Sequence, residues 1–62
     1  MLNHIQHYRI GKGLTQAELA KRVGVTQQAV ANWESGGVTP TVDKALKLAD
    51  ALGVPLDKIL KL

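Results

Sequence analysis

The stretch from Thr15 to Gly36, TQAELAKRVGVTQQAVANWESG, decides the fold that this sequence predicts. Thr15 is followed three residues later by Glu18, which is the spacing of a capping box, so we expect a helix to begin near Gln16. Gly24 is expected to end that helix, because glycine readily adopts the left-handed conformation in which the chain reverses. One short helix followed by a tight turn is therefore predicted at the centre of the chain.

A second helix is expected directly after this turn. Thr26 is its predicted N-cap, which places Gln27 and Gln28 in the first helical turn. Apolar residues at helical spacing form the expected inner surface of both helices: Leu19, Val23, Val25, Val30 and Trp33. Three small residues are expected to let the helices cross closely: Ala20, Gly24 and Ala29. Two helices joined by so short a turn predict a helix-turn-helix unit.

The flanking segments are also predicted to be helical. An N-terminal helix, ended by Gly11 and Gly13, is expected to carry on one face Leu2, Ile5, Arg9 and Ile10. An irregular link through Pro40 is expected to lead into a fourth helix, which Gly53 ends. Apolar residues recur along this helix at intervals of three and four residues: Val42, Ala45, Leu46, Ala49 and Leu52. Pro55 suits the start of a last short helix, from which Leu56, Ile59 and Leu60 pack back. The sequence thus predicts an all-α fold of five short helices in one domain, residues 1–62.

Composition narrows the functional classes. Eight Lys/Arg against five Asp/Glu give 62 residues a net charge of +3, which suits an anionic partner. With no cysteine there is no thiolate zinc site, and His4 with His7 lacks further metal ligands, so no metal or cofactor is expected. The sequence shows no nucleophile beside a base, no carboxylate pair and no phosphate-cradling glycine motif. We therefore do not expect an enzyme. No apolar stretch approaches the length needed to span a membrane, so we expect a soluble, cytoplasmic protein.

The segment TQAELAKRVGVTQQAV, residues 15–30, resembles the phage Cro and repressor (XRE-like) family of helix-turn-helix proteins. The resemblance covers nearly the whole chain, because the family's domain also ends in a segment similar to ALKLADALGVPLDKIL, residues 45–60. It implies a five-helix, lambda-repressor-like bundle that binds double-stranded operator DNA. It also implies a two-fold homodimer, with half-sites about one helical turn apart.

The resemblance places Gln27 and Gln28 at base-reading positions of the recognition helix. A glutamine amide offers a donor and an acceptor that pair with adenine N6 and N7, and it also donates to guanine. Ala29 would leave room for, or touch, a thymine methyl, and Asn32 would reach another base edge or a phosphate. The alternative interpretation of these polar residues is an ordinary solvated helix face.

Contacts to phosphate are expected from residues that flank the recognition helix. The resemblance assigns Gln16 to a phosphate contact, and the full candidate set is Gln16, Thr26, Ser35, Thr39, Thr41 and Lys44. The sequence departs from many relatives in the loop GGVTPT, residues 36–41, which contains no Lys or Arg. We therefore expect a shallower dependence of binding on salt than a richly basic relative would show.

Arg9 and Glu34 fill two positions that pair in the resembling proteins, which implies a partly buried ion pair that fixes the recognition helix. The alternative is two independent surface charges. The apolar C-terminal segment supplies the candidate dimer interface, Leu56, Ile59, Leu60 and Leu62. The competing interpretation is that these residues close the core of the monomer and that the protein dimerises only on DNA.

The sequence therefore predicts a DNA-binding transcriptional regulator, most simply a repressor that occludes a promoter, with no small-molecule ligand and no membrane partner. The rival hypothesis is a protein-interaction module, antitoxin-like or adaptor-like, built on the same fold.

Overall fold

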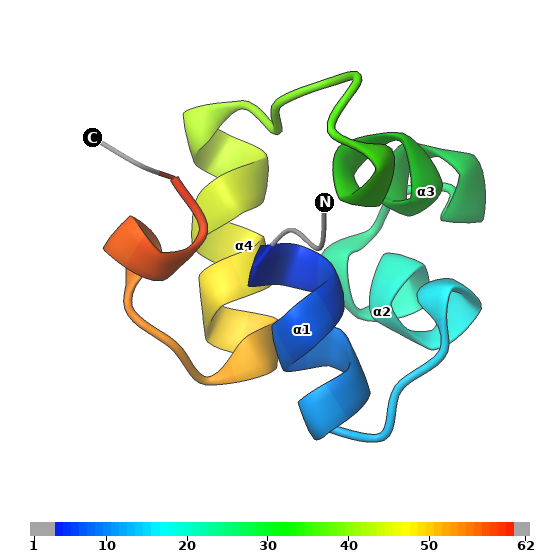
Figure 1. Cartoon of the computed structure of the whole chain (residues 1–62), viewed down its shortest axis with the longest axis horizontal. Helices are drawn as coiled ribbons and strands as arrows, with labels where there is room; N and C mark the ends of the chain where they lie inside the picture. The colour runs from blue at the N-terminus through cyan, green and yellow to red at the C-terminus, as the bar shows by residue number, and fades with distance from the viewer. Residues whose placement is uncertain (1–3, 61–62) are drawn as a thin grey trace.

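The computed structural model of the protein describes residues 4–60 (Figure 1). Four α-helices follow one another along this part of the chain: α1 (His4–Gly11), α2 (Gln16–Val23), α3 (Gln27–Ser35) and α4 (Val42–Leu52). No strand occurs between residues 4 and 60. The predicted all-α class is therefore confirmed.

The fifth helix is shorter than the sequence predicts. It is a single 3-10 turn, η1 (Leu56–Lys58), and Pro55 precedes it without any side-chain capping bond. Backbone bonds from Lys58 to Pro55 (3.0 Å) and from Ile59 to Leu56 (2.9 Å) close this turn. No side-chain bond caps this segment, and within the described residues it does not extend into an α-helix.

The predicted helix boundaries in the central stretch are confirmed. Thr15 and Glu18 form both bonds of a capping box at the start of α2. Gly24 ends α2 with φ +82°, the left-handed conformation that L residues rarely adopt. A Cβ at Gly24 would meet nothing within 4 Å, so the expectation that this glycine allows close helix approach is wrong. The residue is needed for its backbone conformation.

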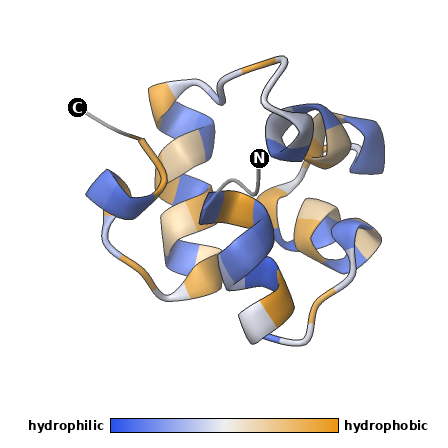
Figure 2. Cartoon of the chain, viewed as in Figure 1, coloured by the Kyte–Doolittle hydropathy of each residue, from blue (hydrophilic) through white to orange (hydrophobic). Residues whose placement is uncertain are grey.

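The core lies where α2, α3 and α4 meet α1. Its fully buried large side chains are Leu19, Val30, Leu48 and Leu52. Each helix carries both hydrophobic and hydrophilic residues (Figure 2). The hydrophobic residues recur at helical spacing, so one face of each helix is left for this core. Pro40 is also buried, although the sequence indicated only a link at that position.

Two parts of the predicted core are wrong. On α4, Val42 and Leu46 are 62% and 52% exposed, whereas Leu48 is fully buried. The buried positions of α4 are Ala45, Leu48, Ala49 and Leu52, which follow a helical stripe that Leu46 leaves by about 100°. On α1, Ile10 is 58% exposed, so it does not share the buried face of Ile5. Leu2 lies outside the described residues.

Among the described residues, no helix is both long enough and apolar enough to cross a membrane.

Candidate nucleic-acid interface

The N-terminal end of α3 is open to solvent. The Thr26 hydroxyl oxygen accepts a hydrogen bond from the backbone N–H of Ala29 at 3.1 Å and so caps the helix. Gln27 and Gln28 are the first two helical residues, and both are exposed. A helix N-terminus has unsatisfied N–H groups and a partial positive charge. This end of α3 therefore suits a partner that is anionic and rich in hydrogen-bond acceptors.

The four residues predicted to read bases lie on α3, but they are not equally accessible. Gln27, Gln28 and Asn32 are exposed. Ala29 is half-buried and packs against the hydrophobic core. Its methyl group is therefore only partly available to a thymine.

Two of these side chains bind each other. Gln28 Nε2 donates a hydrogen bond to Asn32 Oδ1 at 3.0 Å, across one turn of α3. The four-residue spacing places both amides on the same helix face. The sequence placed Asn32 one turn beyond Gln28 but did not predict this bond.

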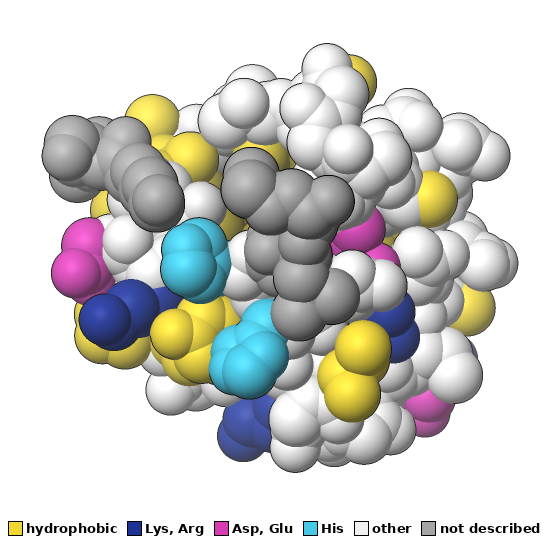
Figure 3. All heavy atoms as spheres, viewed as in Figure 1, with side chains coloured by type: hydrophobic (Ala, Val, Ile, Leu, Met, Phe, Trp, Pro, Cys, Tyr) yellow, Lys and Arg dark blue, Asp and Glu magenta, His cyan; other side chains and the backbone are white. Residues whose placement is uncertain are grey.

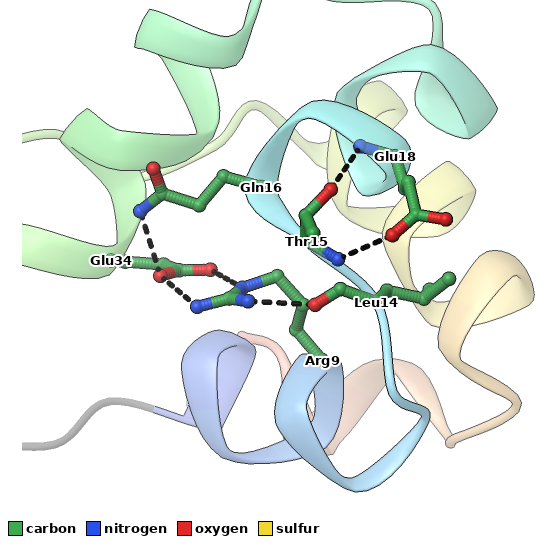
Figure 4. A network of polar contacts seen from close by, with 6 residues as sticks. All are labelled: Arg9, Leu14, Thr15, Gln16, Glu18 and Glu34. Atoms are coloured by element: carbon green, nitrogen blue, oxygen red, sulfur yellow. Dashed lines mark hydrogen bonds and ion pairs between the residues drawn. The ribbon is translucent and has the colours of Figure 1, made fainter.

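The far end of α3 is held by a buried ion pair (Figure 4). Arg9 Nε donates to Glu34 Oε2 at 2.6 Å, and Arg9 Nη2 donates to Glu34 Oε1 at 3.1 Å. The Arg9 and Glu34 side chains are only 12% and 4% exposed. Arg9 Nη1 also donates to the backbone carbonyl of Leu14 at 2.7 Å. This guanidinium thus ties α1 and the loop before α2 to α3, as the family resemblance implies.

Gln16 joins the same cluster. Its Nε2 donates to Glu34 Oε1 at 3.1 Å, so the first residue of α2 is linked to the last turn of α3 (Figure 4). The sequence pointed to a phosphate contact for Gln16 and missed this bond, because the two residues are 18 apart and no local pattern pairs them. One N–H of the amide is committed to Glu34, and the second N–H remains for a ligand.

The remaining phosphate candidates differ in how many of their groups are already used. Thr26 and Thr41 cap α3 and α4 with their hydroxyl oxygens, which leaves each O–H as a donor. Ser35 Oγ donates to the Asn32 carbonyl at 2.9 Å, so its only donor is already occupied. Thr39 is exposed, and Lys44 is half-buried. The polar groups around α3 are therefore mostly neutral.

Positive charge is sparse on this surface. No Lys or Arg occurs between residues 23 and 43, a segment that contains all of α3. Figure 3 shows mainly uncharged atoms over α3, at the upper right. Basic side chains lie elsewhere, around an open hollow of about 590 Å³ between α2 and α4. Its charged lining residues are Lys21, Arg22, Lys47 and Asp50.

The start of α2 differs electrostatically from that of α3. Glu18 Oε1 accepts a hydrogen bond from the Thr15 backbone N–H at 2.9 Å. This bond, followed by the bond to the Thr15 side chain, holds the pKa of Glu18 below its ordinary value, and the nearby Arg22 charge lowers this pKa further. A carboxylate therefore faces the N-terminus of α2, whereas the first turn of α3 has no acidic residue.

The two histidines of α1 lie beside Tyr8. The rings of His4 and Tyr8 are stacked with centroids 6.4 Å apart, and His7 meets Tyr8 edge-on at 5.3 Å. Within residues 4–60, no group of three or more His, Cys, Asp or Glu is arranged to hold a metal ion.

The candidate dimer residues lie at the C-terminal end of the described chain. Leu56, Ile59 and Leu60 are half-buried, and Ile59 packs against the core. Leu62 lies outside the described residues. The segment therefore covers part of the monomer core and also exposes apolar surface.

Comparison with known proteins adds independent information. The sequence pattern of a family described as Helix-turn-helix matches residues 5–59. An uncharacterized HTH-type transcriptional regulator of Methanocaldococcus jannaschii is 37% identical over 59 residues, which cover 95% of this chain and 89% of the relative. An uncharacterized HTH-type transcriptional regulator of Methanothermobacter thermautotrophicus is 47% identical over 49 residues, 79% of this chain and 71% of the relative.

A third relative is a repressor by name. The cryptic phage CTXphi transcriptional repressor RstR of Vibrio cholerae is 36% identical over 45 residues, which cover 73% of this chain and 40% of that protein.

Proposed function

This chain belongs to the helix-turn-helix family of Cro and phage-repressor type and is a DNA-binding transcriptional regulator, and we propose that it represses by reading a pseudo-palindromic operator. The start of α3 enters the major groove. The observation that supports this most directly is the pair of exposed glutamines, Gln27 and Gln28, at the first two positions of a helix whose other end is held by a buried ion pair. That arrangement presents amide groups to base edges with little freedom to reorient the helix.

Base recognition in this proposal comes from the exposed amides of α3. Gln27 and Gln28 contact base edges, and Asn32 lies on the same helix one turn further on. Ala29 contributes a small methyl surface where the helix approaches the bases. Each glutamine amide presents a donor and an acceptor, which is the complement of the major-groove edge of adenine.

Backbone contacts orient α3 and supply affinity without sequence information. They come from the free N–H of the Gln16 amide, the hydroxyls of Thr26, Thr39 and Thr41, the Lys44 ammonium and the free amides at the starts of α3 and α4. Ser35 contributes only if its hydroxyl releases the Asn32 carbonyl. Because few cations take part, few counterions are released, and the dependence of binding on salt is shallow.

We further propose that residues 1–62 act as one DNA-binding unit that works as a homodimer. Its two recognition helices then lie about 34 Å apart, one turn of DNA. Leu56, Ile59, Leu60 and Leu62 form the dimer contact, and η1 takes the place of the family's fifth helix. No catalytic step is involved.

The experiment that tests this function is selection of bound duplexes from a random pool, followed by dissociation constants on the enriched duplex. We expect enrichment of a two-fold symmetric site. Gln27→Ala and Gln28→Ala should each weaken binding to that site by about 1 to 3 kcal/mol and leave binding to random DNA nearly unchanged. Leu46→Gln, on the exposed face of α4, is the matched control and should bind normally.

Two outcomes contradict the proposal. Failure to enrich or retard any duplex at low salt would favour a protein-interaction module. Equal losses on specific and random DNA would exclude base reading by these glutamines. A log–log salt titration on the enriched duplex separately tests the backbone contacts, because a steep slope would show many released ions.

A further inference from the structure

One hydrogen bond on the exposed face of α3 joins two side chains that both point to the proposed DNA surface. Gln28 Nε2 donates to Asn32 Oδ1 at 3.0 Å. Both residues are exposed, and bonds at this spacing on a helix surface add little to stability. The bond therefore matters less for folding than for the direction in which the Gln28 amide faces.

The bond determines which hydrogen-bonding groups Gln28 has left. A glutamine amide has two N–H donors and one carbonyl acceptor. With one N–H directed to Asn32, the amide keeps one donor and one acceptor for a ligand. Adenine presents one acceptor, N7, and one donor, N6, on its major-groove edge, whereas guanine presents the two acceptors N7 and O6. The remaining groups of Gln28 match adenine and not guanine.

We propose that Asn32 is a positioning residue that holds Gln28 in the orientation specific for adenine. This proposal rests on the proposed function, in which the start of α3 enters the major groove. Asn32 acts through Gln28 in this proposal: its carbonyl oxygen accepts from Gln28, and its own N–H groups are left for a phosphate, which specifies no base pair. To read guanine, Gln28 has to break the bond, or both amides have to turn so that the Gln28 carbonyl accepts from an Asn32 N–H.

The orientation is reinforced by the position of Asn32 on the helix. The Asn32 backbone carbonyl accepts the Ser35 hydroxyl at 2.9 Å in the last turn of α3, and the adjacent Trp33 and Glu34 side chains are buried. The helix backbone at residue 32 is thus held from its buried side. The Asn32 side chain is short, so its Oδ1 stays close to the helix and within reach of Gln28.

The test measures dissociation constants of the full chain on the enriched duplex and on three duplexes that differ at the base pair Gln28 contacts. That base pair is the one at which Gln28→Ala loses discrimination. The wild-type protein should prefer A·T over G·C there by at least about tenfold. Asn32→Ala should reduce this preference to about threefold or less, and it should change affinity for the A·T duplex less than Gln28→Ala does.

Two further variants separate positioning from direct reading. Asn32→Asp keeps an oxygen acceptor, so it should retain the A·T preference even though its added negative charge weakens binding to every duplex alike. In the Gln28→Ala background, Asn32→Ala should have no further effect on discrimination, because the group that it positions is absent.

Three results would overturn the inference: an unchanged A·T preference in Asn32→Ala, a loss of discrimination at a different base pair, or additive effects of the two alanine substitutions. Each would leave the proposed function intact, since specific binding and the effect of Gln28→Ala are measured in the same series. Loss of all specific binding by the wild-type protein would instead contradict the proposed function itself.

Discussion

The two helices of the central motif both begin at a threonine, but they are held in opposite ways. The start of α2 is closed locally by a capping box between Thr15 and Glu18. The start of α3 has a threonine cap and no carboxylate in its first turn. It is fixed in place at its other end, where Glu34 is paired with Arg9 across 25 residues.

This difference follows from what each helix end is proposed to face. A carboxylate at a helix N-terminus interacts favourably with the positive end of the helix dipole, but it also repels phosphate. In α2 the carboxylate of Glu18 occupies that position. In α3 the N-terminus is left without negative charge, so its dipole and its two glutamines are available to an anionic partner, and the helix is anchored by a tertiary contact remote from that surface.

The largest effect is expected from breaking the anchor of α3. Arg9→Ala or Glu34→Ala should reduce the free energy of unfolding by about 3 kcal/mol, because each leaves a buried charge without its partner. The double variant should lose less than the sum of the single losses. Urea denaturation of the three variants checks this, and additive losses would show that the pair is not energetically coupled.

A smaller effect, of opposite sign for folding and binding, is expected when α3 is made to resemble α2. Gln27→Glu places a carboxylate in the first turn of α3 and should raise the free energy of unfolding by about 0.5 kcal/mol. The same change should weaken binding to the enriched duplex by about 2 kcal/mol, through loss of the amide and repulsion of phosphate. Gln27→Ala is the control, because it should weaken binding without stabilising the fold. Unchanged binding by the glutamate variant would exclude a DNA contact at this position.

Removal of the two N-caps compares the helix starts directly. Thr15→Ala and Thr26→Ala should each cost about 1 kcal/mol of stability, since each leaves a backbone N–H without its acceptor. Thermal and urea unfolding measure this cost. Thr15→Ser and Thr26→Ser retain the hydroxyl and should restore most of it. If the serine variants are as unstable as the alanine variants, the capping bond is not the cause.

The smallest effect is a pH dependence at the start of α2. The pKa of Glu18 is lower in the folded protein than its ordinary value of 4.5, chiefly through the bonds to Thr15. Its contribution to stability is therefore present above pH 4.5 and lost as the pH falls through the lowered pKa of the folded state. Glu18→Gln should flatten the stability profile in that acidic range, and Thr26→Ala should not. A profile unchanged by Glu18→Gln would show that the carboxylate bond is not formed in solution.

Local sequence patterns predicted the helix boundaries well because the groups that set them are neighbours in the chain. A threonine followed by glutamate three residues later, or a glycine at the end of an apolar stripe, acts over one helical turn. The placement of Gln27 and Gln28 in the first turn of α3 followed from the same local pattern, since it depends only on their position after the Thr26 cap. The pairing of Arg9 with Glu34 was expected from the family resemblance and not from spacing.

Sequence patterns were less informative about burial where two faces of one helix both carry hydrophobic residues. On α4, Leu46 and Leu48 are equally hydrophobic, and the choice between them depends on which face α2 and α1 cover. Likewise, the length of the last helix depends on how far residues 56–60 pack back, and the expected α-helix is a single 3-10 turn. Neither outcome is encoded in one helical turn.

The amino-acid sequence by itself thus determined where the two helices of the central motif begin and end and which amides open α3, because short-range hydrogen bonds and backbone preferences control both. Only the tertiary structure decided that Gln16 binds Glu34 and that Leu48 rather than Leu46 enters the core. Side-chain contacts of this kind depend on how separate helices and rotamers are placed in three dimensions, and the one-turn rules that set helix ends contain no such information.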